Sequence, residues 1–446
     1  MKAMKRLLFS LLLLSGSLAL PAQFKTGYAS LDDSETVRAL KEHIAYIASP
    51  SMLGRAPGSD GEKETAIYLT QVLSSYGVDI LSGEEGDLFG IRQESGDTLT
   101  SRNVIAFIPG HDKVLKDKYI VIGARMDNLG TMSMTVDGEK RLLVFNGANG
   151  NASGVAMLLE LARMLKTNAY SLRRSVILAA FGASTQMFAG SWYFLNRSFA
   201  DVQGIEAMID LDMLGTASEG FYAYSFSNPD MNIIAQTLAG TLQPVLPEVT
   251  ARQPFASDQI SFYDKEIPSI LFTTGRFPEY QTHRDVESII EYEPMERELE
   301  YIYNYTVSLA NGPKPIFNAE SEIRKRSASG DGVIPYYDCD RKPSFLGSTD
   351  PRLFLEKWVY QYLKYPDEAV RNGIQGKVLV DFIIDENGKV TDVKVLRGVD
   401  ELLDAEAVRV IAASPAWKPG YVKGKKVRSE ISLYVEFRLE KKRNKR

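Results

Sequence analysis

Cysteine and histidine are scarce in this sequence. The 446 residues include one cysteine, Cys339, and three histidines, His43, His111 and His283. A single thiol cannot form an internal disulfide, so the chain must be stabilised by packed cores. Acidic residues flank Cys339 on both sides, which disfavours the thiolate that thiol catalysis requires. The formal charge of -5 also provides no basic excess of the kind that nucleic-acid binding needs.

The ends of the chain differ in character from the rest. Lys2, Lys5 and Arg6 precede an apolar run over 7–14, and small residues follow it up to Ala22. This pattern predicts a secretory signal peptide over 1–22, and the apolar run is too short to remain as a membrane anchor. At the other end, the basic segment 441–446 is expected to be a solvated tail.

Between these ends, short apolar runs alternate with amphipathic segments. Apolar residues at helical spacing predict helices over 34–49, 62–76 and 153–165, the last with Ser153 as a plausible N-cap. Apolar runs predict strands over 103–108, 119–124, 175–181, 207–212 and 269–273. Wholly apolar strands that alternate with helices imply a sheet buried on both faces. The sequence therefore predicts an α/β fold in which a mixed sheet is flanked by helices on both faces.

The character of the chain changes after residue 312. Gly, Pro, Ser and charged residues without a sustained period predict a connection over 313–344. A small α+β domain is predicted over 345–440, large enough to bury its own core. Its expected elements are a helix over 352–363, strands over 377–384 and 390–396 joined by an Asn-Gly turn, a helix over 404–413 and a strand over 429–439.

Five polar segments follow or lie between the predicted strands of the first domain, at 123–130, 147–154, 181–185, 211–213 and 280–283. Together with Asn103-Val104-Ile105-Ala106, Ser257-Asp258 and Ile267-Pro268, they occur in the order seen in a known family. The segment 30–312 resembles the zinc aminopeptidases, a family that includes aminopeptidase Y, the bacterial leucyl aminopeptidases and the related glutaminyl cyclases. The resemblance implies a zinc-exopeptidase-like fold for this part of the chain.

The resemblance also implies that most of the family's metal ligands are missing. Members of the family hold two zinc ions with histidines and carboxylates, and a further carboxylate acts as general base. Here a histidine ligand corresponds to Arg125, the bridging aspartate to Gly150 and the general base to Ser184. The adjacent glutamate ligand corresponds to Thr185, and the last histidine ligand to Gln281. No catalytic residue and no bound metal are therefore expected, and no cofactor is expected although the family uses zinc.

Two acidic residues of the family pattern are retained. Asp212 corresponds to a metal ligand, and Asp127 to the aspartate that orients the lost histidine. A buried guanidinium needs a carboxylate partner, so we expect Arg125 to form an ion pair with Asp127 or Asp212 that replaces the metal at the centre of the pocket. The predicted vestigial pocket comprises Arg125, Asp127, Gly150, Ser184, Thr185, Asp212 and Gln281.

A rebuilt metal site is the alternative. His283 lies two residues beyond the lost histidine ligand and could join Asp212, Asp258 and Asp285 in a single-metal site. The other two histidines are expected to be structural or exposed to solvent. Ser184 is not expected to be a nucleophile, because no histidine–acid pair is evident beside it.

The second domain resembles the C-terminal domain of the TonB family. The residues that carry this resemblance include Tyr365-Pro366, Gly376-Lys377-Val378, Gly388-Lys389-Val390, Trp417-Lys418-Pro419-Gly420 and Phe437. It implies a periplasmic adaptor whose sheet edge pairs with an extended peptide of a partner, which is β-augmentation. A domain that serves only stability or dimerisation remains the alternative.

The whole pattern predicts an exported pseudo-peptidase in the periplasm or cell envelope of a Gram-negative bacterium. Its function would be the binding of a peptide or a cell-envelope protein partner, with no role in nucleic-acid binding and no transmembrane anchor after cleavage of the signal peptide. The alternative is an active metal-dependent exopeptidase with the rebuilt site.

Overall fold

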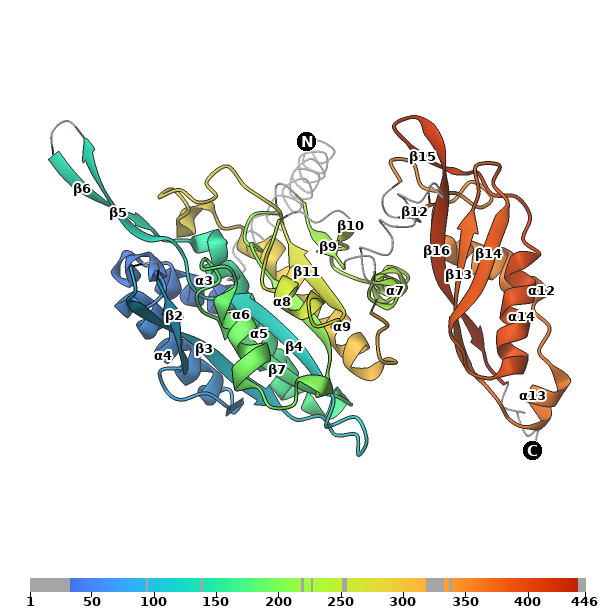
Figure 1. The fold of residues 1–446 in the computed structure, drawn as a ribbon, viewed down its shortest axis with the longest axis horizontal. Helices are drawn as coiled ribbons and strands as arrows, with labels where there is room; N and C mark the ends of the chain where they lie inside the picture. Colours follow the sequence, from blue (N-terminus) through green and yellow to red (C-terminus); the bar gives the residue numbers. More distant parts are fainter. Residues whose placement is uncertain are drawn as a thin grey trace, which may run out of the picture.

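A mixed sheet forms the centre of the larger domain in the computed structural model (Figure 1). The structure describes residues 33–93, 95–136, 139–217, 220–225, 228–250, 255–317, 333–336 and 339–439. The predicted signal peptide over 1–22 and the basic tail over 441–446 lie outside the described residues. Within these ranges, no helix has the length and the apolar character that crossing a bilayer would require.

The strand order of this sheet places four parallel strands at its centre. Strands β7 (Ser175–Phe181), β4 (Tyr119–Arg125), β8 (Ile205–Leu211) and β11 (Ser269–Thr273) are parallel neighbours. The flanking strands in sheet order are β1 (Asp79–Ile80) and β3 (Thr98–Ile108) on one side, and β9 (Tyr222–Tyr224) and β10 (Glu248–Thr250) on the other, with β2 (Asp87–Arg92) also paired to β3. Strand β3 is antiparallel to β7, so the sheet is mixed as predicted.

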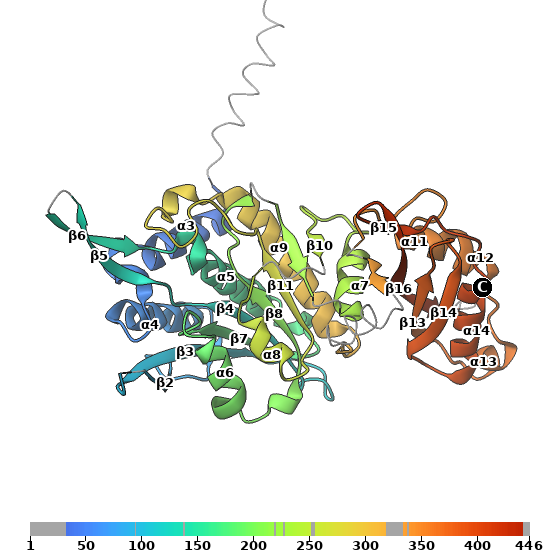
Figure 2. The same ribbon diagram turned by 45° about the horizontal axis from the view of Figure 1, so that its top comes forward.

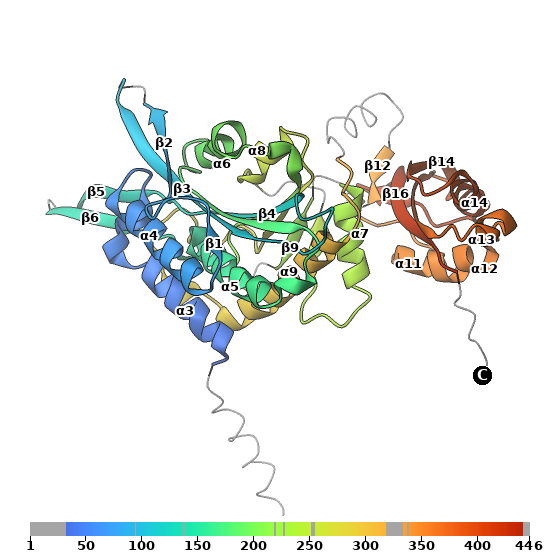
Figure 3. The same ribbon diagram turned by 90° about the horizontal axis from the view of Figure 1, so that it is seen from below.

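Side chains of the central strands alternate between two apolar clusters. In β4, Ile120 and Ile122 lie in one cluster and Val121 lies in the other, as the two-residue period of a strand requires. Helices α3 (Glu35–Ile47), α4 (Asp60–Ser75), α5 (Ser153–Thr167) and α9 (Tyr292–Asn311) cover the first face, and the shorter α6 (Ala189–Tyr193) and α8 (Gln259–Tyr263) cover the second (Figure 3). The predicted sheet with helices on both faces is confirmed.

Two of the three predicted helices begin at a serine whose side chain caps the helix. Ser34 accepts a hydrogen bond from the Val37 amide at 3.0 Å, and Ser59 accepts one from the Glu62 amide at 3.2 Å. The prediction of Ser153 as an N-cap is wrong, because Ser153 is already the first helical residue of α5. Its hydroxyl instead donates to the side chain of Asn149 and accepts from the amide of Leu214, which ties the start of the helix to the loop after β8.

A hairpin that the sequence did not predict projects from this domain. Strands β5 (Gly130–Val136) and β6 (Glu139–Phe145) pair antiparallel, and they extend away from the main sheet (Figures 1 and 2). The hairpin follows directly on the segment after β4, so its base lies beside the residues of the candidate site.

The second domain has its own sheet and core. Its sheet order is β12 (Val333–Pro335), β16 (Lys425–Phe437), β13 (Gly376–Ile384) and β14 (Val390–Arg397), and β15 (Gly420–Val422) also pairs with β16. Helix α14 (Glu401–Ala412) packs on β13 and β14, and α13 (Asp367–Arg371) lies beside it. The core includes Phe354, Phe382 and Trp417. An α+β domain is therefore confirmed in this part of the chain.

Two details of the second domain differ from the expected pattern. The helix expected over 352–363 consists of α11 (Pro351–Phe354), a π-helical turn η9 (Leu355–Val359) and α12 (Tyr360–Tyr362). Strand β12 pairs with β16 although it lies within the segment predicted as a connection over 313–344. Cys339 is buried in this domain as well, so part of that connection belongs to the second domain.

The two domains are in contact. The hydroxyl of Tyr434 on β16 donates a hydrogen bond to the carboxylate of Asp230, at the start of α7 (Pro229–Leu238) in the first domain. The other oxygen of Asp230 accepts from the amide of Ile316 at 2.7 Å. Helix α7 lies against the second domain in Figure 2, so the carboxylate of Asp230 ties the first domain, the chain that leaves it and the second sheet together.

Candidate functional site

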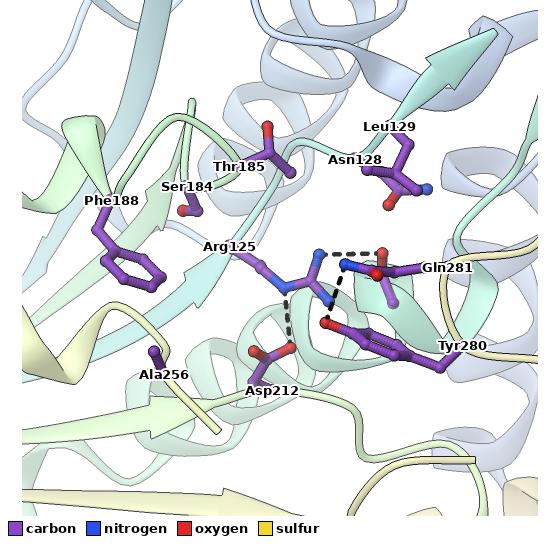
Figure 4. A pocket seen from close by; sticks show the side chains of 11 residues that line it. Arg125, Asn128, Leu129, Ser184, Thr185, Phe188, Asp212, Ala256, Tyr280 and Gln281 are labelled. Atoms are coloured by element: carbon purple, nitrogen blue, oxygen red, sulfur yellow. Dashed lines mark hydrogen bonds and ion pairs between the residues drawn. The ribbon is translucent and has the colours of Figure 1, made fainter. Parts of the chain in front are cut away.

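The candidate site lies at the carboxyl ends of the four parallel strands, where open α/β sheets bind ligands. Arg125 ends β4, Ser184 and Thr185 follow β7, and Asp212 follows β8. Figure 4 shows these side chains around one pocket with Tyr280 and Gln281 from the loop after β11. Five of the seven predicted pocket residues line the pocket with their side chains, and Gly150 lines it with its backbone. Asp127 is not among the lining residues.

The pocket is small and mostly polar. Its volume is about 180 Å³, below the roughly 300–1,000 Å³ of pockets for drug-sized ligands. Asn128, Leu129, Phe188, Ala256 and Tyr280 complete the lining. Such a space accommodates one small group or the end of a longer ligand.

An ion pair between Arg125 and Asp212 occupies the centre of the site. The Nε atom of Arg125 donates to Oδ1 of Asp212 at 3.0 Å, and both side chains are about nine-tenths buried or more. Burial alone lowers the pKa of Arg125, but the Asp212 carboxylate, together with Tyr280 and Asp127, raises the pKa above its ordinary value. The predicted ion pair of Arg125 is present, with Asp212 and not Asp127 as the partner.

Asp127 has a different role in the structure. Its carboxylate accepts hydrogen bonds from the amides of Ser184 at 2.7 Å and Thr185 at 3.0 Å, and from the hydroxyl of Thr185. Burial raises the pKa of Asp127, while these hydrogen bonds and Arg125 oppose the rise. Asp127 therefore fixes the loop after β7, which contains Ser184 and Thr185.

Ser184 forms a hydrogen bond to a second buried carboxyl group. Its hydroxyl donates to Oδ2 of Asp258 at 2.6 Å. Burial raises the pKa of Asp258 to about 7, although the hydrogen bond from Ser184 acts in the opposite direction. The amide of Ser184 is thus held by Asp127 and its hydroxyl by Asp258.

Gly150 places backbone in contact with Arg125. The carbonyl of Gly150 accepts from Nη1 of Arg125 at 3.1 Å, and its amide donates to Oδ2 of Asp285 at 3.0 Å. A Cβ atom at this position would lie 3.1 Å from Oδ2 of Asp285 and 3.4 Å from Nη2 of Arg125. An aspartate here would direct its carboxylate at the guanidinium and against a second carboxylate.

The structure does not support the rebuilt metal site. Asp285 points toward the amides of Asn149 and Gly150, at 2.7 and 3.0 Å, and His283 is exposed. Asp258 is engaged with Ser184. In the described part of the chain, which includes all four residues of the predicted set, no three His, Cys, Asp or Glu side chains form a group that could hold a metal ion.

The residues of this pocket do not fit the zinc centre that the fold family implies. Zinc needs several thiolate, imidazole or carboxylate donors around one point. Here Arg125 places a permanent positive charge beside Asp212, the one carboxylate that lines the pocket, and this carboxylate is already bonded to the guanidinium and to the Ser257 hydroxyl. No catalytic step can be assigned to a metal in this arrangement.

Arg55 is a structural residue of the site that the sequence did not reveal. It is fully buried and donates hydrogen bonds to the carbonyls of Ile47, Met126, Asn146 and Gly147. Burial lowers the pKa of Arg55 to about 10, while Asp285 opposes this. Its guanidinium thereby joins the end of α3 to the loops that carry Asp127 and Gly150. A single arginine that lies far before β4 in the sequence belongs to no motif, so no signal in the sequence indicated it.

Comparisons with known proteins agree with both resemblances. Residues 103–306 match Peptidase family M28, and residues 361–439 match the Gram-negative bacterial TonB protein C-terminal domain. The chain therefore contains a peptidase M28 domain joined to a TonB C-terminal domain.

Individual relatives are distant. Aminopeptidase YwaD of Bacillus subtilis (strain 168) is 26% identical over 133 residues, which is 29% of each chain, so the match spans under a third of that relative. The aminopeptidase from Aneurinibacillus sp. strain AM-1 is 18% identical with a TM-score of 0.49, over 63% of this chain and 96% of that one. Porphyromonas gingivalis glutaminyl cyclase is 20% identical with a TM-score of 0.47, over 60% of this chain and 97% of that one.

Proposed function

We propose that this protein is an exported pseudo-peptidase, a non-catalytic binding or scaffold protein with an aminopeptidase-like pocket and a TonB-like adaptor domain. The observation that carries the proposal is the buried ion pair of Arg125 and Asp212 at the centre of the pocket. A metallopeptidase needs a metal to activate water and a carboxylate to remove its proton. Here the positions of the bridging carboxylate and the general base are Gly150 and Ser184.

The second domain supports a role in binding an envelope protein partner. Strand β16 pairs with β15 at residues 425–427, with β12 at residues 428–430 and with β13 at residues 429–437. In the family that this domain resembles, a sheet edge accepts an extended peptide through main-chain hydrogen bonds. This role, with the predicted signal peptide, corresponds to the periplasm or cell envelope of a Gram-negative bacterium.

The proposal predicts no hydrolysis of aminoacyl chromogenic substrates, with or without added zinc. The variant Arg125→His should also be inactive, because it restores one ligand and leaves the positions of the bridging carboxylate and the base unchanged. Restoring His, Asp, Glu and Glu at Arg125, Gly150, Ser184 and Thr185 should still be insufficient without a histidine at Gln281. The assay measures release of the chromophore over hours at high protein concentration. Zinc-dependent turnover by the unmodified protein would overturn the proposal, and recovery of activity by Arg125→His alone would show that the assignment of ligand positions is wrong.

A further inference from the structure

The guanidinium of Arg125 has hydrogen-bonding capacity that the protein leaves unused. Its Nε donates to Asp212 and its Nη1 to the carbonyl of Gly150. No acceptor among the described residues takes a hydrogen bond from Nη2, although Arg125 is only 9% exposed. The guanidinium lies within the pocket beside Tyr280 and Gln281 (Figure 4). Nη2 is not among the buried side-chain atoms that lack a partner, so it is open to the pocket. A ligand that supplies an acceptor there can form a charge-assisted hydrogen bond with it.

Asp212 is the one carboxylate among the residues that line the pocket, and it is already hydrogen-bonded; Oδ1 of Asp258 has no partner among the described residues, but Asp258 does not line the pocket. Asp212 accepts from Arg125 and from the hydroxyl of Ser257. Asp127 accepts three hydrogen bonds from Ser184 and Thr185, and Asp285 accepts two backbone amides. The pocket therefore presents a spare cationic donor and no open carboxylate. A ligand ammonium group would meet the guanidinium and would find no free anionic partner.

The remaining lining sets the size and polarity of the ligand. Leu129, Phe188 and Ala256 provide apolar surface. Tyr280 accepts a hydrogen bond from Nε2 of Gln281 at 3.4 Å, which leaves its phenolic proton available. In a cavity of about 180 Å³, these groups match a carboxylate that carries one small apolar substituent.

We propose that the pocket binds the carboxylate end of its ligand, as in the C-terminal residue of a peptide, through Nη2 of Arg125. This inference rests on the proposed binding function, and it specifies which end of a peptide is recognised. The carboxylate bonds in a charge-assisted geometry to the guanidinium, while the apolar substituent contacts Leu129 and Phe188. A side chain at Gly150 would place its Cβ atom 3.4 Å from Nη2, where it would take up part of the space beside the guanidinium.

The test compares four mixtures of short tripeptides with the full mature chain. The mixtures have identical sequences and differ only in their ends: both free, N-acetylated, C-amidated, or both blocked. Binding is measured by titration calorimetry and by the rise in the unfolding temperature. We expect amidation to weaken binding at least tenfold and acetylation to change it less than twofold. Binding that depends on the free amine and tolerates amidation would overturn this inference but leave the binding function intact. Absence of binding by all four mixtures would overturn both the inference and a peptide-binding role for this pocket.

A pair of variants separates charge from shape. Gln281 is exposed at the mouth of the pocket, so its substitution should not unfold the protein. Gln281→Glu places a carboxylate next to the pocket that competes for Arg125, and we expect it to weaken peptide-acid binding at least tenfold. Gln281→Met has similar length without the charge and should weaken binding much less. An equal response of the two variants would contradict the inference.

Discussion

Replacing Asp212 by asparagine is expected to destabilise the first domain by about 3 kcal/mol or more, the range typical when one partner of a buried ion pair is removed. The change leaves the guanidinium of Arg125 buried with neutral acceptors only and no directly bonded carboxylate. The double variant Arg125→Met with Asp212→Asn should recover most of the loss, because it removes the charge that would otherwise stay buried. Urea and thermal unfolding followed by circular dichroism measure both effects.

An exposed ion pair in the same domain provides the control. Lys41 and Asp33 are 2.5 Å apart and more than two-fifths exposed, so Asp33→Asn should change stability by less than about 1 kcal/mol. If Asp212→Asn loses no more stability than Asp33→Asn, and the double variant recovers none of the loss, the ion pair does not organise the pocket.

Replacing Glu298 by glutamine is expected to stabilise the protein at alkaline pH. Glu298 is buried on α9, and its Oε2 has no hydrogen-bond partner among the described residues. Burial raises the pKa of Glu298 from its ordinary value of 4.5 to about 9. Because the folded-state pKa lies above the unfolded value, the contribution of this group to stability is fully present below pH 4.5 and is lost as the pH rises toward 9.

The size of this effect follows from the cost of about 1.4 kcal/mol per pKa unit. Between pH 4.5 and pH 8 the destabilisation caused by the buried Glu298 carboxyl grows to roughly 4 to 5 kcal/mol. The glutamine that replaces it would itself be buried without hydrogen-bond partners, which offsets part of the gain. We therefore expect Glu298→Gln to gain about 3 kcal/mol at pH 8 and almost nothing at pH 4. Glu300→Gln, on the exposed side of the same helix, removes the same charge and should have no comparable pH dependence. A gain that is independent of pH would contradict the assignment.

The features of the fold that follow from local pattern could be predicted from the sequence. Apolar strands such as 119–124 and 175–181 alternate with amphipathic helices, and that alternation defines the sheet and its covered faces. Strand β12 was not predicted because three residues within a polar stretch are too few to show the two-residue alternation of a strand. Its pairing with β16 depends on contacts about 95 residues apart in the chain.

Most residues of the candidate site could be predicted from the sequence, but the contacts between them could not. The resemblance indicated that Arg125 replaces a ligand and needs a carboxylate, yet both Asp127 and Asp212 were candidates. Only the structure shows that the loop amides after β7 occupy Asp127 and leave Asp212 for the guanidinium. The sequence also could not show that Asp285 accepts hydrogen bonds from the backbone amides of Asn149 and Gly150, whereas His283 is exposed.

Metal content is the most direct test of the central claim, which is that an arginine–aspartate ion pair has replaced the metal centre. The purified mature protein is incubated with zinc, desalted and examined by elemental analysis. The account predicts less than about a tenth of an equivalent of zinc, because the pocket lacks the donors that a zinc site needs. One or two equivalents that remain bound after desalting would contradict it.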